Sequence, residues 1–230
     1  MNKTAYNVNG RECILYSCDN IECLLIHPID EYDYELLDKQ VDCIENEVGE
    51  TFALAALRIN DWNSELSPWE AEPVFGKEPF RGGAQNTLSF IEKCMIPDIL
   101  VRCGLSEEIP IIIGGYSLAG LFALWSGYFA ESFTAVAAAS PSVWFPGWIE
   151  FARAQDIKVQ SVYLSLGDKE EKAKNKTMAA VGACIREQQA ILNERKDVMV
   201  TLEWNEGNHF RDSDIRTGKA FAWCISQQKK

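Results

Sequence analysis

Short apolar runs alternate with polar turns along the chain and predict its first elements. Residues 10–17 and 23–29 are apolar runs of strand length, and the turn residues Asp19 and Asn20 lie between them. This arrangement predicts two paired strands at the edge of a sheet. Pro28 is expected to end the second strand, because proline has no backbone N–H to donate.

Apolar positions spaced three or four residues apart then predict helices. Between residues 36 and 48 such positions fall on one helical face, and Gly49 follows as the stop. Residues 84–103 have the same spacing, although Pro97 must kink or divide that helix. Further helices are expected at residues 148–154, at 176–194 and at the end of the chain, where Phe221, Cys224 and Ile225 face inward.

The remaining apolar runs predict strands between these helices, at residues 51–59, in the run that leads into Ser117, and at 133–139, 158–166 and 198–204. From about residue 50 onward, strands and helices therefore alternate. This alternation predicts the α/β class, with a mostly parallel central sheet and helices on both faces. In such sheets the binding and reactive groups gather at the carboxyl ends of the strands.

Residues 60–83 form an unusually long segment without a clear period, rich in proline, glycine and asparagine. Long loops in compact domains are often functional. A surface excursion that buries Trp62 and Trp69 is equally compatible with the pattern. Both interpretations remain open.

Ser117 has the most informative surroundings in the chain. Three isoleucines end in Gly114 and Gly115, and a helix-forming segment begins directly after the serine. The pattern Gly115-x-Ser117-x-Ala119 is typical of a nucleophilic serine on a tight strand-to-helix turn, where small neighbours let strand and helix approach closely. The alternative is an ordinary glycine-containing loop between a core strand and a core helix.

A nucleophilic serine needs a base, usually a histidine that a carboxylate orients. The chain has two histidines. His27 lies in an early apolar run and is expected to be structural, whereas His209 follows the last predicted strand, in the chain order serine, acid, histidine. The acidic turn after residues 158–166 supplies the acid: Glu170 is favoured, Asp168 is second, and Glu171 competes with both.

Acyl transfer at Ser117 would also need two backbone donors for the oxyanion. Leu118, directly after the serine at a helix start, is the first candidate. The second is expected from Asp61 or Trp62, in the loop after residues 51–59. The candidate substrate-binding residues are Trp62, Trp69, Trp144 and Tyr116, although packing under loops would account for the tryptophans equally well.

Composition limits the possible partners. The chain has 230 residues, 47% of them hydrophobic, and no visible linker, so we expect a single domain across residues 1–230. The formal charge of −12 would repel nucleic acid and anionic membrane surfaces. A small-molecule partner fits better, and the oligomeric state stays open.

The compartment is inferred from apolar runs and cysteines. No run approaches the length of a membrane span, and residues 1–8 lack the apolar core of a secretion signal, so we expect a cytoplasmic protein. Its eight cysteines would then be reduced. Because no Cys-x-x-Cys pair occurs, buried thiols are expected rather than a metal site.

Three segments together carry a family resemblance: residues 115–120 (Gly-Tyr-Ser-Leu-Ala-Gly), 139–144 (Ala-Ser-Pro-Ser-Val-Trp) and 207–210 (Gly-Asn-His-Phe). They resemble the α/β-hydrolase superfamily, and within it the bacterial esterases that include esterase D and the siderophore (enterobactin-type) esterases. Ala119 departs from the glycine that is common there, and the acid does not fall on an unambiguous motif position. The short chain leaves little room for a separate lid domain.

The resemblance implies hydrolysis of a small-molecule carboxylic ester through an acyl-serine intermediate, with no metal or organic cofactor. Ser117 would be the nucleophile, His209 the general base and acid, and Glu170 or Asp168 the residue that orients the histidine. Two alternatives remain open. One is an acyltransferase that uses the same residues, and the other is a non-catalytic binding protein that retains the fold.

Overall fold

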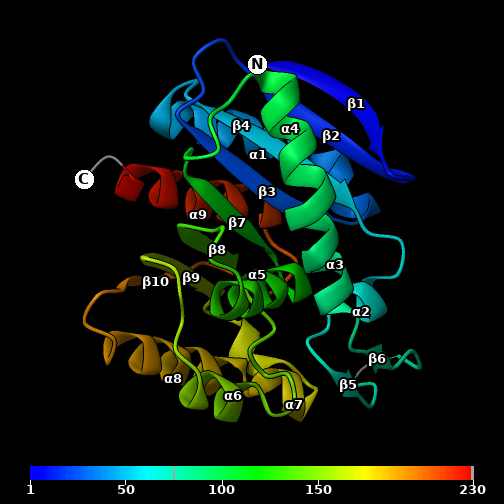
Figure 1. Ribbon diagram of the computed structural model, residues 1–230. Helices are drawn as coiled ribbons and strands as arrows, with labels where there is room; N and C mark the ends of the chain where they lie inside the picture. Colours follow the sequence, from blue (N-terminus) through cyan, green and yellow to red (C-terminus); the bar gives the residue numbers. More distant parts are fainter. Residues whose placement is uncertain (75, 229–230) are drawn as a thin grey trace.

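The computed structural model describes residues 1–74 and 76–228, and an eight-stranded sheet forms its centre (Figure 1). The strands lie in the order β1-β2-β4-β3-β7-β8-β9-β10. Neighbours from β4 to β10 are parallel, whereas β1, β2 and β4 pair antiparallel in succession. The strand bounds are β1 Asn2–Val8, β2 Arg11–Ser17, β3 Cys23–Ile29, β4 Phe52–Arg58, β7 Ile111–Tyr116, β8 Ala135–Ala139, β9 Ser161–Gly167 and β10 Met199–Asn205.

Helices cover both faces of this sheet, as predicted. One face packs against α1 (Glu31–Val48) and α9 (Ser213–Gln228), which also contact each other. The other face carries the larger core, formed with the remaining long helices α3 (Ala84–Phe90), α4 (Ile96–Cys103), α5 (Leu118–Phe129), α6 (Trp148–Ala154) and α8 (Val181–Asn193). The fold is an α/β-hydrolase fold, and residues 1–74 and 76–228 contain no separate lid domain.

The first two predicted strands are not paired with each other, and the edge prediction was wrong. β4 lies between β2 and β3, and the two edge strands of the sheet are β1 and β10. Every residue of β3 is buried, which suits an interior parallel strand. Pro28 does not end β3, which stays paired with β4 up to Ile29. Pairing of β3 with β7 stops at Ile26, so the N–H that Pro28 lacks would lie beyond the last hydrogen bond between those two strands. β1 was missed because its first six residues are not buried.

The two helices that the spacing predicted most clearly both form. α1 begins after Asp30, whose carboxylate accepts from the N–H of Asp33, and ends at Gly49 with a φ of 78°. The predicted helix of residues 84–103 is divided, because a π-helical turn, η1 (Ile91–Met95), separates α3 from α4. Pro97 lies in the first turn of α4, where its missing N–H costs little.

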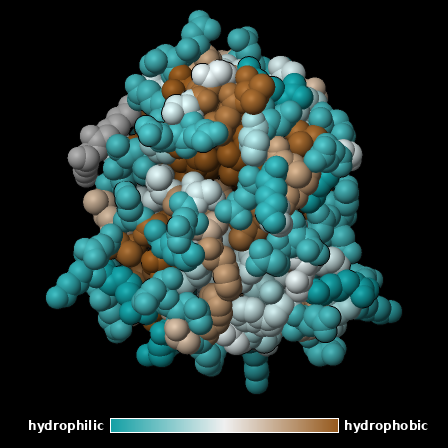
Figure 2. All heavy atoms as spheres, in the orientation of Figure 1, coloured by the Kyte–Doolittle hydropathy of each residue, from teal (hydrophilic) through white to brown (hydrophobic). Residues whose placement is uncertain are grey.

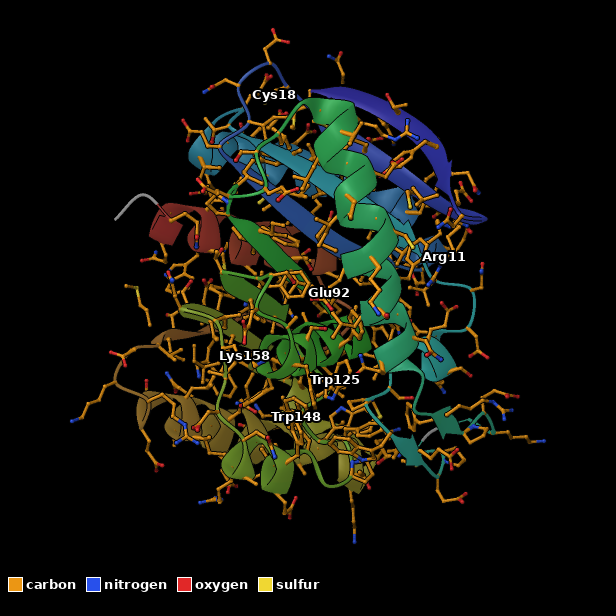
Figure 3. The ribbon with its side chains drawn as sticks, viewed as in Figure 1. Arg11, Cys18, Glu92, Trp125, Trp148 and Lys158 are labelled. Carbon is orange, nitrogen blue, oxygen red and sulfur yellow. The ribbon has the colours of Figure 1, made fainter. Side chains whose placement is uncertain are left out.

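The segment at residues 60–83 is an excursion that contains small elements. It holds α2 (Trp62–Glu65) and a two-stranded sheet of β5 (Glu70–Ala71) and β6 (Phe80–Arg81). Its Trp69 packs against Phe145 and Trp148, and Leu66 is fully buried. Figure 3 labels Trp148 in the helical layer around α5 and α6, where its indole N–H donates to Gln188 Oε1 at 2.7 Å.

The predicted helix at residues 176–194 is likewise divided into α7 (Lys176–Ala179) and α8. A short 3-10 helix, η2 (Glu170–Lys172), precedes it at the carboxyl end of β9. The last helix, α9, turns Phe221, Cys224 and Ile225 into the core as predicted. The face of the molecule in Figure 2 is mostly hydrophilic, with hydrophobic side chains gathered over α4, where Val101 is exposed.

His27 is a buried structural residue within β3. Its Nδ1 lies 3.2 Å from the Nε2 of Gln40 in α1, and its ring packs edge-on against Phe221. Burial lowers the pKa of His27 to about 3, so the ring is neutral. All eight cysteines are free thiols, and three of them are buried; the prediction of buried thiols therefore holds for that subset. Within residues 1–74 and 76–228, no helix is both long and apolar enough to span a membrane.

Candidate active site

Ser117 lies in the tight turn between β7 and α5, with a φ of 57°. This left-handed conformation is strained for a residue with a side chain. The close approach of strand and helix explains the small neighbours, since a Cβ on Gly115 would lie 2.6 Å from the Cβ of Ala119. The N–H of Ser117 donates to the Ala139 carbonyl at 3.1 Å, and its own carbonyl accepts from Ser142 at 3.0 Å. The turn is therefore held from β8 and the segment that follows it.

His209, on the loop between β10 and α9, lies beside this serine. Its Nε2 is 3.0 Å from Ser117 Oγ, and its Nδ1 is 2.6 Å from Glu170 Oε2. The Tyr116 hydroxyl donates to the His209 carbonyl at 2.7 Å. Burial raises the pKa of Tyr116, so the phenol keeps the proton that it donates. The histidine is thus held by its backbone as well as by its ring.

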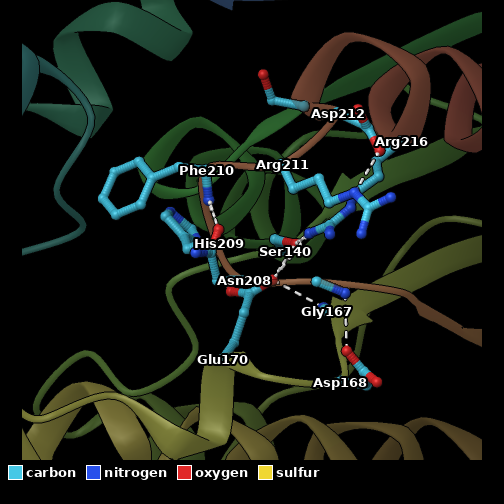
Figure 4. Close-up of polar contacts among 12 residues, drawn as sticks. Ser140, Gly167, Asp168, Glu170, Asn208, His209, Phe210, Arg211, Asp212 and Arg216 are labelled. Atoms are coloured by element: carbon cyan, nitrogen blue, oxygen red, sulfur yellow. Dashed lines mark hydrogen bonds and ion pairs between the residues drawn. The ribbon is translucent and has the colours of Figure 1, made fainter.

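Among the three acids considered, Glu170 is the one in contact with His209. Glu170 lies in η2 and is 6% exposed. Asp168 instead accepts the backbone N–H of Gly207 at 2.7 Å, and Glu171 forms an ion pair with Arg186. Figure 4 shows Glu170 extending toward the part of the His209 loop that carries Asn208, and Asp168 at a separate position, joined by a dashed line to the same loop.

Arg216 is a residue that the sequence analysis missed. It lies on α9, is 1% exposed, and its Nη1 contacts Glu170 Oε1 at 3.1 Å and the Tyr116 hydroxyl at 3.1 Å. Its Nη2 donates to the Glu206 carbonyl at 3.0 Å. A buried guanidinium that reaches the acid, the Tyr116 phenol and the His209 loop links the three segments of the site. The one signal in the sequence was the position of Arg216 on the inner face of the predicted last helix. That signal was easy to overlook because charged residues are rarely buried.

The Glu170 carboxylate is fully engaged. Oε1 accepts from the Ser140 hydroxyl at 2.7 Å and from the Gly167 N–H at 2.8 Å, in addition to Arg216. Oε2 faces His209. The two oxygens therefore have different partners: Oε1 binds Ser140, Gly167 and Arg216, whereas Oε2 binds His209.

The backbone N–H groups expected to bind an oxyanion differ in whether they already donate a hydrogen bond elsewhere. Leu118 begins α5 and Trp62 begins α2, and the first N–H groups of a helix have no partner within it. The N–H of Asp61 is already donated to Glu65 Oε1 at 2.9 Å. Trp62 borders the same cavity as Ser117. Of the two alternatives, Trp62 therefore remains the candidate for the second donor.

Two cavities meet at His209 and Phe210. The smaller, of about 160 Å³, is lined by Ser117, Trp62 and Tyr116, and also by Asp30 and Asp33. Burial, reinforced by the Asp30 carboxylate, raises the pKa of Asp33 to about 7. The larger cavity, of about 490 Å³, contains Trp144 and Met178 with Lys169, Lys172 and Lys174.

Three of the four predicted substrate-binding residues therefore border one of these cavities, and Trp69 does not. The Trp69 indole N–H donates to the Pro146 carbonyl at 2.9 Å, and its ring packs among Phe145, Trp148 and Phe151. Phe210, which is 81% exposed and borders both cavities, was missed. Its signal in the sequence was an aromatic side chain directly after the candidate base.

The described residues contain no group of three or more histidine, cysteine or acidic side chains placed to hold a metal ion. What they bring together is a serine hydroxyl, an imidazole and a carboxylate in hydrogen-bonding order, at the start of helix α5. This arrangement can deprotonate the hydroxyl and stabilise the imidazolium that results.

Comparison with known proteins agrees with the fold. No protein-family model and no curated protein sequence matches the chain. An IroE-like serine hydrolase from Shewanella oneidensis is similar in structure, with 14% identity, a TM-score of 0.81 and 98% of this chain and 80% of that chain covered. The siderophore hydrolase EstA from Aspergillus nidulans has 15% identity, a TM-score of 0.71 and coverage of 100% and 94%. Enterochelin esterase from Shigella flexneri has 14% identity, a TM-score of 0.68 and coverage of 98% and 59%.

Proposed function

We propose that the protein is a serine hydrolase that cleaves carboxylic esters through an acyl-serine intermediate. One observation carries the proposal: His209 contacts Ser117 Oγ through Nε2 at 3.0 Å and Glu170 through Nδ1 at 2.6 Å. These residues come from three segments far apart in the sequence. A serine, a base and an orienting acid in this order are the parts that nucleophilic catalysis at a hydroxyl requires.

In the first half of the reaction, Ser117 Oγ attacks the ester carbonyl carbon while His209 Nε2 takes its proton. The resulting oxyanion accepts from the N–H groups of Leu118 and Trp62. Collapse of the tetrahedral intermediate breaks the bond to the alcohol oxygen, and the imidazolium returns the proton to that oxygen. The alcohol leaves, and the acyl group remains on Ser117.

In the second half, water replaces the alcohol. His209 takes a proton from the water as it attacks the acyl carbon. The second tetrahedral intermediate then breaks its bond to Ser117 Oγ, which receives the proton from His209, and the carboxylic acid leaves. Glu170 stabilises the imidazolium at both stages. Arg216 and two further donors hold its Oε1, so the carboxylate keeps its place beside the ring.

Labelling with a fluorophosphonate probe, which modifies activated serines, tests the proposal. The wild-type protein is expected to react stoichiometrically, and Ser117→Ala to lose both labelling and ester hydrolysis. Ser142→Ala is the matched control, because it removes the neighbouring hydroxyl, 3.4 Å from Ser117 Oγ, and is expected to keep the label. Labelling that survives in Ser117→Ala would refute the assignment of the nucleophile.

The substrate is proposed as a small-molecule ester, hydrolysed in the cytoplasm by one domain without a metal or organic cofactor. Some of the structural neighbours are siderophore hydrolases by name. A catecholate siderophore ester therefore belongs in the substrate panel beside p-nitrophenyl esters of graded acyl length. The two cavities together offer room for a compound of modest size on both sides of the ester bond.

A further inference from the structure

The larger cavity has a charge opposite to that of the whole protein. The chain has a formal charge of −12, yet Lys169, Lys172 and Lys174 all border this cavity. Within the described part of the chain, none of the three forms an ion pair with a carboxylate. Three uncompensated cations beside the candidate base are a local positive field in an acidic molecule.

No carboxylate in the cavity wall is free to neutralise these lysines. Glu170 is the acid among the residues that line the cavity, and both of its oxygens are engaged by Arg216 and His209. The neighbouring acid Glu171 is paired with Arg186, outside the lining. The lysines are therefore available to an anion from outside the chain.

The segment that carries the lysines is anchored at both ends. The N–H of Lys169 donates to the Gly207 carbonyl at 3.1 Å, which joins the segment to the His209 loop. At the other end, Asn175 Nδ2 donates to the Val74 carbonyl at 2.8 Å. The backbone beneath the three side chains is thus held next to the candidate base rather than at an arbitrary surface position.

We propose that the larger cavity is a subsite for the alcohol portion of the ester, and that this portion is an apolar or aromatic body with a carboxylate at its periphery. This proposal rests on the proposed function. Ser117 and Trp62 line the smaller cavity and not the larger one, so the carbonyl carbon and the acyl portion lie on that side. The alcohol oxygen must receive its proton from His209, which borders both cavities, and the alcohol portion can therefore extend past His209 into the larger cavity. Trp144 and Met178 supply the apolar wall, and the lysines supply the charge.

The smaller cavity supports the same orientation by excluding the opposite one. Asp30 borders it, so a carboxylate on the acyl portion would meet a like charge there. An ester with a small uncharged acyl group and an anionic alcohol portion is the combination that both cavities accept.

Two esters that differ in one charge test the subsite: 4-acetoxybenzoate and its uncharged methyl ester, both of which release acetate and a phenol. The readout is the ratio of their kcat/KM values, compared between wild type and Lys169→Gln/Lys172→Gln/Lys174→Gln. The ratio in the triple variant is expected to fall about tenfold, equivalent to about 1.4 kcal/mol, since exposed ion contacts are individually weak. Intrinsic reactivity of the two esters cancels in this comparison.

Lys176→Gln is the matched control. Lys176 is exposed and begins α7, in the same segment, but does not line the cavity. It is expected to leave the ratio within about twofold of wild type, because a charge outside the cavity is screened by solvent. A fall in the ratio as large as that of the triple variant would overturn the subsite in favour of a general surface effect.

Each remaining outcome is decisive. Unchanged selectivity in the triple variant, with Ser117-dependent hydrolysis intact, would overturn the subsite but not the esterase. A lysine-dependent preference for mono-4-nitrophenyl succinate over 4-nitrophenyl butyrate would overturn the assignment to the alcohol portion. If neither acetate is hydrolysed, the proposed function fails. The subsite can then still be tested by calorimetry, which compares the binding of 4-hydroxybenzoate with that of methyl 4-hydroxybenzoate in wild type and triple variant. If the preference for 4-hydroxybenzoate does not depend on the lysines, the subsite is refuted.

Discussion

At the scale of single residues, the division of work between the two oxygens of Glu170 is the main feature of the site. Oε1 has three donors from the scaffold, whereas Oε2 has the His209 ring. A carboxylate held by this many donors has little freedom to turn away from the histidine. It can therefore fix the ring and its tautomer without itself taking the proton.

Glu170→Gln is expected to lower kcat by about 10²- to 10⁴-fold, because the amide keeps the shape but cannot stabilise an imidazolium. Asp168→Asn is the comparison variant. Its side-chain oxygen can still accept the Gly207 N–H, so the loss is expected to stay below about fivefold. Steady-state kinetics on one p-nitrophenyl ester measures both. The reverse order of losses would make Asp168 the orienting acid.

Arg216 is expected to act as a positioning residue through Glu170 rather than on substrate. Arg216→Lys keeps the charge but cannot reach all of the acceptors that the guanidinium contacts. We expect kcat to fall by about tenfold with little change in KM, and Arg216→Met to lose about ten times more because it leaves a buried carboxylate unpaired. Kinetics measured together with thermal unfolding separates this from simple destabilisation. A rise in KM at constant kcat would contradict a positioning role.

At the scale of elements, the turn around Ser117 depends on contact between β7 and α5. The missing side chain of Gly115 leaves room for the Cβ of Ala119, and Gly120 passes close to the Gly115 carbonyl. This explains how an alanine is accommodated where a glycine is common in such turns. One methyl fits at this contact, and a second does not.

Gly115→Ala and Ala119→Gly change the same contact by one methyl in opposite directions. In Gly115→Ala the new Cβ would lie 2.6 Å from one atom of Ala119 and 2.9 Å from its backbone carbon, so strand and helix must separate at a cost of about 3 kcal/mol. Ala119→Gly costs about 1 kcal/mol through helix propensity. Urea unfolding measures both. Equal losses would mean that the contact is not tight.

The positions of the elements along the chain were predictable, whereas their neighbours in space were not. Periodicity is local, so α1 and the strand before Ser117 could be located from spacing alone. The order of β2, β4 and β3 depends on which faces are buried, and an apolar run does not reveal its neighbour. β1 escaped notice because its outward residues are polar and β2 is its only neighbour in the sheet.

In the candidate active site too, positions along the chain were predictable, whereas contacts between distant segments were not. Ser117 and His209 follow strands of one parallel sheet, so their convergence at one edge could be expected. That Glu170 rather than Asp168 contacts His209 depends on the turn after β9, in which Asp168 accepts from Gly207 before η2 begins at Glu170. Arg216 and Trp69 depend on packing between elements distant in sequence, which no local pattern encodes.

At the scale of the whole molecule, two groups contribute to the pH dependence of stability with opposite signs. The pKa of His27 is lowered to about 3 by burial, so its contribution is present above the ordinary histidine range and is lost as the pH falls. The pKa of Asp33 is raised to about 7, by burial and then by Asp30. The folded protein retains that proton where the unfolded chain has released it, so the contribution of Asp33 is lost as the pH rises from about 4 to about 7.

Asp33→Asn is expected to remove the second of these contributions, because asparagine resembles the protonated acid in shape and charge. At pH 4.5 the free energies of unfolding of variant and wild type should agree within about 0.5 kcal/mol. At pH 8 the variant should be more stable by about 1 to 2 kcal/mol, a figure reduced for the partial exposure of Asp33. Urea unfolding at both pH values measures the difference, with Asp42→Asn, an exposed position on the same helix, as the control. A gap between Asp33→Asn and wild type that does not widen with pH, or one that Asp42→Asn reproduces, would contradict the role of burial at Asp33.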